Sequence, residues 1–341
     1  MKTNITMRDI AEKLGVSSVT VSKALNDKEG VSADLKLKIK QVAAEMGYRY
    51  NTSARAMKDG RSYNIGVTIP ERFTGMTQSF YLNIYQSLSK SLEQKGYYGI
   101  LHILSSIDEK TLVPPRIYSE QKVDGLIILG QVSKEYIEMM QSVNIPVVFM
   151  DFYDEKTDMD AVITDNFYGA YDLTNYLISK GHKEIGYVGN LYATSSIQDR
   201  FLGYYKSLLE HRLERNDNYI LNDRNEEGKF VDIQLPNQMP TAFVCNCDQV
   251  ARLLINKLVL NGYQVPEDVS VVGFDNDAYA TIGFPELTTV AVNVEEMART
   301  AVQFMYEKVN DPSKKFGRVQ VKGRIIYRDS VSSPTASPQK V

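Results

Sequence analysis

The sequence TMRDIAEKLGVSSVTVSKALN at residues 6–26 predicts two short helices joined by a tight turn. In the first helix Thr6 and Asp9 have the Thr-x-x-Asp form of an N-terminal cap, and helical spacing separates the apolar residues Met7, Ile10, Ala11 and Leu14. Gly15 ends that helix. In the second helix we expect Val21, Ala24 and Leu25 to face inward. With a third helix from Ser32 to about Met46, this arrangement is a helix-turn-helix.

Charge divides the chain into a basic head and an acidic body. Residues 1–61 contain 12 Lys and Arg against 7 Asp and Glu, whereas the whole chain of 341 residues has 39 basic and 42 acidic residues. A basic head suggests a polyanionic partner, although an ordinary solvated basic surface has the same charge.

From Tyr63 onward, short β-branched runs alternate with helical stretches, which is typical of parallel sheets with crossover helices. We expect strands at 64–69, 97–102, 125–129, 146–150, 184–188, 241–245 and 270–274, in 287–293, and near Val319 and Ile325. The expected helices are 80–95, 133–142, 167–180, 197–213, 248–261 and 294–309. The pattern predicts two doubly wound lobes.

Several classes of protein are disfavoured by the sequence. It has no apolar run long enough for a membrane helix, and MKTNITMRDI lacks the apolar core of a signal peptide. Two cysteines make no disulfide framework, so we expect a cytoplasmic protein. The motifs of serine hydrolases, phosphate loops, dinucleotide sites and zinc proteases are missing, so we expect no catalytic residue and no cofactor. Cys245-x-Cys247 is a weak metal motif, and we expect no metal site.

Several motifs together resemble the lactose-repressor and galactose-repressor (LacI/GalR) family. In the head these are DIAEKLGVSSVTVSKALN, the Val-Ser at 31–32 and GYRYNTSARAM at 47–57. In the body they are IPVVFMD at 145–151, RFLGY at 200–204 and VGFDND at 272–277. The chain is therefore identified as a member of the family, and the resemblance continues to about residue 330.

The resemblance implies an α/β protein with a small all-α helix-turn-helix head and a two-lobed body. That body would be periplasmic-binding-protein-like, with parallel doubly wound sheets. The expected parts are a DNA-binding domain at 1–50, a hinge helix at 51–61, a first lobe from 62–163 and 293–322, a second lobe from 164–292 and 323–333, and a disordered tail at 334–341.

In the family the second helix lies in the DNA major groove. The resemblance thus assigns DNA contacts to Thr6, Ser17, Ser18, Val19, Thr20, Ser22, Lys23 and Asn26, and in the hinge to Asn51, Ala54, Met57 and Lys58. Lys23 is suited to guanine O6 and N7 but lacks the bidentate fork of Arg. Met57 occupies the place of the leucine that relatives wedge between base steps in the minor groove. A plain linker is the alternative for the hinge.

Effector contacts are expected at the carboxyl ends of the strands, where ligands of such sheets bind. The resemblance and this position together indicate Phe80, Tyr81, Asp151, Tyr192, Arg200, Cys247 and Asp275. Carboxylates and a guanidinium suit adjacent sugar hydroxyls, and aromatic rings suit the apolar face of a sugar. The alternatives are a loop cap for Asp275, a structural ion pair for Arg200 and a core position for Phe80. Cys247 stands where the family usually has Asn.

The sequence thus predicts a DNA-binding transcriptional repressor controlled by a small effector, for which a saccharide is favoured. We expect a homodimer on pseudo-palindromic operator DNA, because residues 331–341 are Pro-rich and lack the apolar heptads of tetrameric relatives. We expect no membrane partner. The alternatives are a regulator that responds to a nucleobase co-repressor, a free-standing sugar-binding protein and, least favoured, an enzyme.

Overall fold

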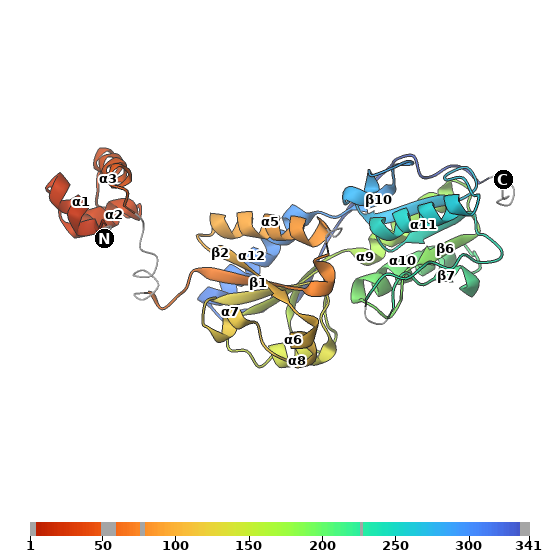
Figure 1. Cartoon of the computed structure of the whole chain (residues 1–341), viewed down its shortest axis with the longest axis horizontal. Helices are drawn as coiled ribbons and strands as arrows, with labels where there is room; N and C mark the ends of the chain where they lie inside the picture. The colour runs from red at the N-terminus through yellow and green to blue at the C-terminus, as the bar shows by residue number, and fades with distance from the viewer. Residues whose placement is uncertain (1–4, 49–58, 76–78, 226–227, 335–341) are drawn as a thin grey trace. The chain divides into compact units, whose positions relative to one another are not determined.

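The computed structural model describes residues 5–48, 59–75, 79–225 and 228–334. The chain divides into a small N-terminal unit, residues 1–61, and a large body, residues 62–341 (Figure 1). Within the described residues, no helix combines the length and apolarity that crossing a bilayer requires.

The small unit is a bundle of three helices, α1 (Met7–Leu14), α2 (Ser18–Leu25) and α3 (Ala33–Glu45). Thr6 and Asp9 form a reciprocal capping box at the start of α1, and Gly15 ends the helix in the left-handed conformation at φ 65°. Ser17 and Ser32 cap α2 and α3 through their side chains. The helix-turn-helix that the sequence predicts is confirmed.

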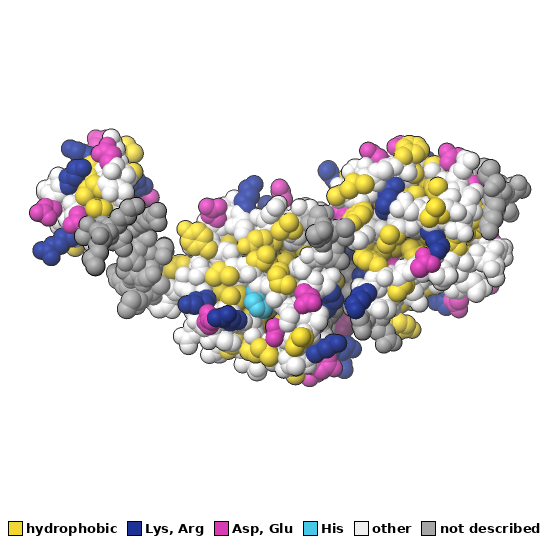
Figure 2. Space-filling model, viewed as in Figure 1, with side chains coloured by type: hydrophobic (Ala, Val, Ile, Leu, Met, Phe, Trp, Pro, Cys, Tyr) yellow, Lys and Arg dark blue, Asp and Glu magenta, His cyan; other side chains and the backbone are white. Residues whose placement is uncertain are grey.

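The core of the small unit is formed by the inward faces of its three helices. Its buried residues are Ile10, Ala11, Val21, Ala24, Ile39, Val42 and Ala43. The opposite face of α2 is open, and Val19 is 65% exposed there. Contact between water and a large apolar side chain is unfavourable. An exposed side chain of this kind therefore marks a face that a partner can cover. The space-filling view shows basic side chains on the surface of this unit (Figure 2).

The first lobe of the body contains a six-stranded parallel sheet in the order β11-β5-β4-β3-β1-β2. Its strands are β1 (Asn64–Pro70), β2 (Tyr98–Leu104), β3 (Gly125–Leu129), β4 (Val147–Met150), β5 (Asp160–Thr164) and β11 (Arg318–Val321). Its helices are α5 (Ser79–Gln94), α6 (Ser106–Lys110), α7 (Arg116–Ser119), α8 (Lys134–Met140) and α12 (Val294–Asn310), with a 3-10 turn η1 (Glu71–Phe73).

The second lobe contains another six-stranded sheet, in the order β12-β10-β9-β8-β6-β7. All its pairings are parallel except that of β12 with β10. The strands are β6 (Ile185–Val188), β7 (Ile220–Leu221), β8 (Ala242–Cys245), β9 (Ser270–Asp275), β10 (Thr288–Ala291) and β12 (Arg324–Ile326). The helices are α9 (Asn166–Ser179), α10 (Ser195–Glu210) and α11 (Asp248–Leu260), with 3-10 turns η2 (Asp217–Tyr219) and η3 (Ala278–Ala280).

The chain passes between the two lobes three times, from β5 to α9, from β10 to α12 and from β11 to β12. The predicted fold class, a helix-turn-helix head with two doubly wound parallel lobes, is confirmed. Sequence patterns did not predict β5 or β7. The two-residue strand β7 is too short to show alternation, and the five residues of β5 carry an acidic first position, Asp160, that the fold buries.

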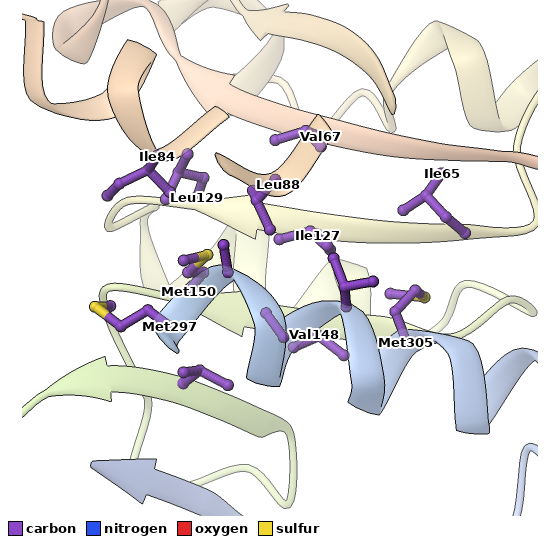
Figure 3. Close-up of a cluster of buried hydrophobic side chains, with 14 of the residues drawn as sticks. Ile65, Val67, Ile84, Leu88, Ile127, Leu129, Val148, Met150, Met297 and Met305 are labelled. Carbon is purple, nitrogen blue, oxygen red and sulfur yellow. The ribbon is translucent and has the colours of Figure 1, made fainter. Parts of the chain in front are cut away.

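The larger core of the first lobe lies between its sheet and the helices α5 and α12. Figure 3 shows Ile84 and Leu88 of α5 together with Met297 and Met305 of α12, gathered with side chains of the central strands. In the second lobe, one buried cluster joins α11 to the sheet and another joins α9 and α10 to it. These layers hold the strand ends in fixed positions.

The contact between α9 and α10 provides a test of this packing. A Cβ atom added at Gly203 of α10 would overlap the backbone oxygen of Phe167 in α9. Gly203→Ala must therefore separate the two helices, and we expect the free energy of unfolding to fall by more than ~2 kcal/mol. Urea denaturation measures this change. The neighbouring Leu202→Ala, at a 44% exposed position, is the control and should cost less; equal costs would contradict the packing argument.

Candidate DNA interface and effector cleft

The outer face of α2 presents Ser18, Val19 and Lys23 as exposed side chains. The other sequence-predicted positions also have local structural roles. Ser17 Oγ accepts a hydrogen bond from the Thr20 backbone at 3.0 Å, and Asn26 Nδ2 donates to Ser22 O at 2.7 Å. These bonds fix the helix ends, and Ser18, Val19 and Lys23 remain exposed on α2.

Thr6 lies at the start of α1, where it is held by the capping box. Its backbone nitrogen and its hydroxyl both donate to Asp9 Oδ2, at 2.7 and 2.8 Å. Thr6 is exposed, so a phosphate contact stays compatible with the cap. The predicted hinge residues Asn51, Ala54, Met57 and Lys58 lie outside the described residues.

A cleft in the body is lined by residues of both lobes. Six of the seven sequence-predicted effector residues line it: Phe80, Tyr81, Asp151, Arg200, Cys247 and Asp275. The strands β4, β8 and β9 each end beside this cleft, so the shared direction of parallel strands brings Asp151, Cys247 and Asp275 to it.

Arg200 of α10 is the buried centre of the second-lobe wall, with 5% exposure. Its Nε donates to Asn166 Oδ1 at 2.8 Å, and its Nη2 donates to Asp275 Oδ1 at 3.2 Å. Nη1 donates to the backbone oxygen of Asn246, and the guanidinium stacks 3.8 Å from the centre of the Phe274 ring. Arg200 therefore has a structural ion pair as well as a position on the cleft.

Asp151 has a carboxylate oxygen without a protein partner. Tyr81 donates its hydroxyl to Asp151 Oδ2 at 2.8 Å, whereas the buried Oδ1 has no hydrogen bond. The residue is 5% exposed, and its backbone has φ 67°. Burial raises the pKa of Asp151, partly offset by the charge of Arg200. A buried unpaired acceptor is costly, so this oxygen favours a ligand that donates a hydrogen bond.

Asp275 faces the same cleft from the end of β9, with its backbone at φ 103°. Burial raises the pKa of Asp275 to about 7; Arg200 opposes this shift, and the nearby carboxylates of Asp277 and Asp151 add to it. Three carboxylates, that of Asp151 from the first lobe and those of Asp275 and Asp277 from the second, therefore line the cleft together with Arg200 and Arg224. The arrangement accepts hydrogen bonds and disfavours an anionic ligand.

The cleft also includes residues that the sequence did not indicate, among them Phe73, Arg224, Phe230, Asn246 and Asp277. Arg224 donates its Nε to the buried Asp223 Oδ2 at 2.8 Å, and its guanidinium lies 5.0 Å from the centre of the Phe230 ring. Asp277 lies within the quoted motif VGFDND, and this motif could have indicated it. Phe73 and Phe230 lie in no recognised motif.

Tyr192 does not line the cleft, unlike the other six predicted effector residues. Its side chain is 92% exposed, and its backbone nitrogen donates to Asn190 Oδ1 at 3.0 Å. That turn after β6 directs the ring to solvent. Asp248 is also outside the lining: its buried carboxylate accepts from Thr289 Oγ1 at 2.6 Å and from the Asp277 backbone at 3.0 Å. Asp248 therefore holds the loop that carries Asp275 and Asp277.

Hydrogen bonds from Ser195 and to Asp199 of the second lobe join the lobes beside the cleft. Ser195 Oγ donates to Gln131 Oε1 at 3.1 Å, and Tyr153 donates its hydroxyl to Asp199 Oδ1 at 3.0 Å. Both second-lobe partners belong to α10, the helix that carries Arg200. Among the described residues, no cluster of three His, Cys, Asp or Glu side chains has the geometry for a metal ion. Cys245 and Cys247 are free thiols.

Two family models match the chain. The model of bacterial regulatory proteins of the lacI family matches residues 6–51, and the model of the periplasmic binding protein-like domain matches residues 174–331. The transcriptional regulator RegA of Clostridium saccharobutylicum is 30% identical over 334 residues, which cover 95% of this chain and 98% of that relative. The chain belongs to the LacI family of bacterial regulatory proteins.

Other relatives also match this chain over nearly its whole length. The transcriptional repressor PurR of Vibrio campbellii is 28% identical over 96% of this chain and 98% of its own. A structure of the lac repressor dimer bound to operator and the anti-inducer ONPF has a TM-score of 0.73 at 23% identity, covering 97% and 100% of the two chains. A complex of the regulator CelR with cellobiose has a TM-score of 0.68 at 20% identity, covering 96% and 100%. These structures share the fold.

The raised pKa of Asp275 predicts a pH dependence of stability. Its folded-state pKa of about 7 lies above the ordinary value of 3.8, so the folded protein keeps a proton that the unfolded chain releases. The free energy of unfolding should therefore fall as the pH rises from about 4 to about 7. Asp275→Asn removes this titration, and Asn tolerates the left-handed backbone.

We expect the stability of Asp275→Asn relative to the parent to increase by up to ~4 kcal/mol over this pH range. Urea denaturation at several pH values measures it. Asp158→Asn, whose side chain is 91% exposed, is the matched control and should leave the pH profile unchanged. A difference between Asp275→Asn and the parent that stays constant with pH would contradict the prediction.

Proposed function

We propose that this LacI-family protein is a transcriptional repressor whose affinity for operator DNA is set by a small molecule in the cleft. The unpaired, buried Asp151 Oδ1 is the observation that carries the effector part of this proposal. The helix-turn-helix with its open α2 face supports the DNA part. We place the protein in the cytoplasm, because that is where it meets operator DNA, and we assign it no catalytic step.

We propose a neutral saccharide as the effector. The carboxylates of Asp151, Asp275 and Asp277 accept hydrogen bonds from hydroxyl groups, and the rings of Phe80 and Phe230 suit the apolar face of a sugar. A nucleobase co-repressor is the second candidate, since the same rings are able to stack on a planar base. Because regulators named PurR are among the relatives, nucleobases are included in the ligand screen described below.

We propose that the repressor acts as a homodimer on a pseudo-palindromic operator. Large apolar side chains are exposed on the second lobe at Leu253 in α11 and at Ile282 and Phe284 after η3. Apolar area of this kind is typical of a surface that a second subunit covers. A related structure is that of a lac repressor dimer on operator.

The proposed base contact by Lys23 is open to a direct test. Lys23→Ala should weaken operator binding by roughly 1 to 3 kcal/mol, chiefly through one base pair in each half-site, because the ammonium is suited to guanine acceptors. Binding site selection from random DNA, followed by titration of single-base variants, measures this. Lys38→Ala, at another exposed lysine of the head, is the control. A uniform loss over all sequences would make Lys23 a phosphate contact.

The effector proposal predicts a repressor that no longer responds to its ligand. A thermal-shift screen against sugars, oligosaccharides and nucleobases first identifies the ligand, which at 100 times its dissociation constant adds about 2.7 kcal/mol of stability. Asp151→Asn then replaces an acceptor by an amide, while Asn still suits the backbone at φ 67°. We expect a loss of about 10- to 100-fold in ligand affinity with operator affinity unchanged.

Calorimetry with the identified ligand and a gel shift with operator separate these two effects. Glu155→Gln, an exposed position in the loop after β4, is the control, and its operator binding should respond to the ligand like that of the parent. Parental ligand affinity in Asp151→Asn would place the ligand elsewhere.

A further inference from the structure

One part of the cleft wall is apolar, although the cleft as a whole is rich in charge. Cys247 and Phe230 line the cleft and also pack against the buried core cluster between α11 and its sheet. At these two residues the hydrophobic core of the second lobe therefore extends to the cleft. Cys247 immediately precedes α11, and Phe230 pairs with Arg224 in an isolated bridge.

Two polar side chains beside these residues, Asn246 and Arg224, are already bonded to the protein, and Arg224 is paired with the buried Asp223. Asn246 Nδ2 donates one hydrogen bond to Val188 O at 3.0 Å and another to Asp223 Oδ2 at 2.8 Å. Its Oδ1 accepts from Arg224 Nη2 at 3.3 Å. The amide nitrogen has two hydrogens, and both are used. Asn246 cannot turn a donor toward a ligand without losing its hydrogen bond to Val188 O or to the buried Asp223.

The thiol of Cys247 is a poor hydrogen-bond partner for a ligand. Burial raises the pKa of Cys247 to about 12, so the side chain stays an uncharged thiol at ordinary pH. A neutral thiol is a weak donor and a weak acceptor, and it behaves as a small apolar group. A ligand hydroxyl placed against it would exchange strong bonds to water for a poor partner, which costs affinity.

We propose that Cys247 and Phe230 determine effector specificity by selecting a ligand whose edge at this wall carries a methyl group or an unsubstituted carbon instead of a hydroxyl. The effector is then a deoxy sugar, held at Asp151 and Asp275 through its remaining hydroxyls. This inference rests on the proposed function, since it narrows the saccharide class bound in the same cleft.

Matched sugar pairs that differ by one hydroxyl test the proposal. The probes are D-galactose with D-fucose, L-mannose with L-rhamnose, and D-glucose with 2-deoxy-D-glucose, each titrated by calorimetry into the full-length protein. In at least one pair the deoxy member should bind about tenfold or more tightly than its parent. Cys247→Ser adds a hydroxyl at nearly the same volume, so it should reduce that ratio to about twofold or reverse it. Phe230→Leu keeps the wall apolar, so it should preserve the preference.

Each outcome separates this inference from the function it rests on. Binding of the parent sugar at least as tightly as its deoxy partner in every pair that binds overturns the inference and leaves the saccharide proposal standing. A deoxy preference that Cys247→Ser does not change removes Cys247 from the specificity wall. Binding by none of the six sugars, with operator affinity retained, overturns this inference, whereas the saccharide proposal fails only if every sugar and oligosaccharide of the thermal-shift screen fails to bind. Cooperative urea unfolding and operator binding of each variant establish that it is folded.

Discussion

The buried guanidinium of Arg200 is the interaction on which the geometry of the cleft depends. It joins the start of α9 through Asn166, the end of β8 through the backbone of Asn246, and the end of β9 through Asp275. A buried charge is tolerated only when hydrogen bonds and a counter-charge replace its water. The surrounding loops are therefore held where they satisfy Arg200, and the same loops carry Asp275, Cys247 and Asp277.

Other acidic side chains of the second lobe are fully bonded to the protein, whereas Asp151 of the first lobe is incompletely paired. Asp248 holds the Asp277 backbone and Thr289, and Asp223 holds Asn190, Asn246 and Arg224. Asp151, in contrast, has one oxygen bonded to Tyr81 and one without a partner. A ligand gains most from a hydrogen bond to an acceptor that has no protein partner, and Asp151 Oδ1 is such an acceptor on the first lobe. A ligand bound there and to the second lobe therefore links its binding to the arrangement of the two lobes.

The same helix also connects the cleft to the contacts between the lobes. Ser195 and Asp199 of α10 bond to Gln131 and Tyr153 of the first lobe. These bonds are made by neutral or partly exposed groups and are individually modest. A ligand with different affinity for different lobe arrangements can therefore shift their populations, and a repressor requires this for release of DNA.

The sequence by itself determined the helix-turn-helix, the alternation of strands and helices, and the placement of Asp151, Cys247 and Asp275 at strand ends. It did so because caps and periodicity are local, and because the carboxyl ends of parallel strands meet on one side of a sheet. Only the tertiary structure decided which loop side chains reach the cleft. Tyr192 turns to solvent, whereas Arg224 and Phe230 turn inward, because Asp223 is buried and bonds to Asn190 and Asn246, which are distant in the sequence. Long-range hydrogen bonds of this kind leave no periodic pattern in the chain, so no local motif could have indicated them.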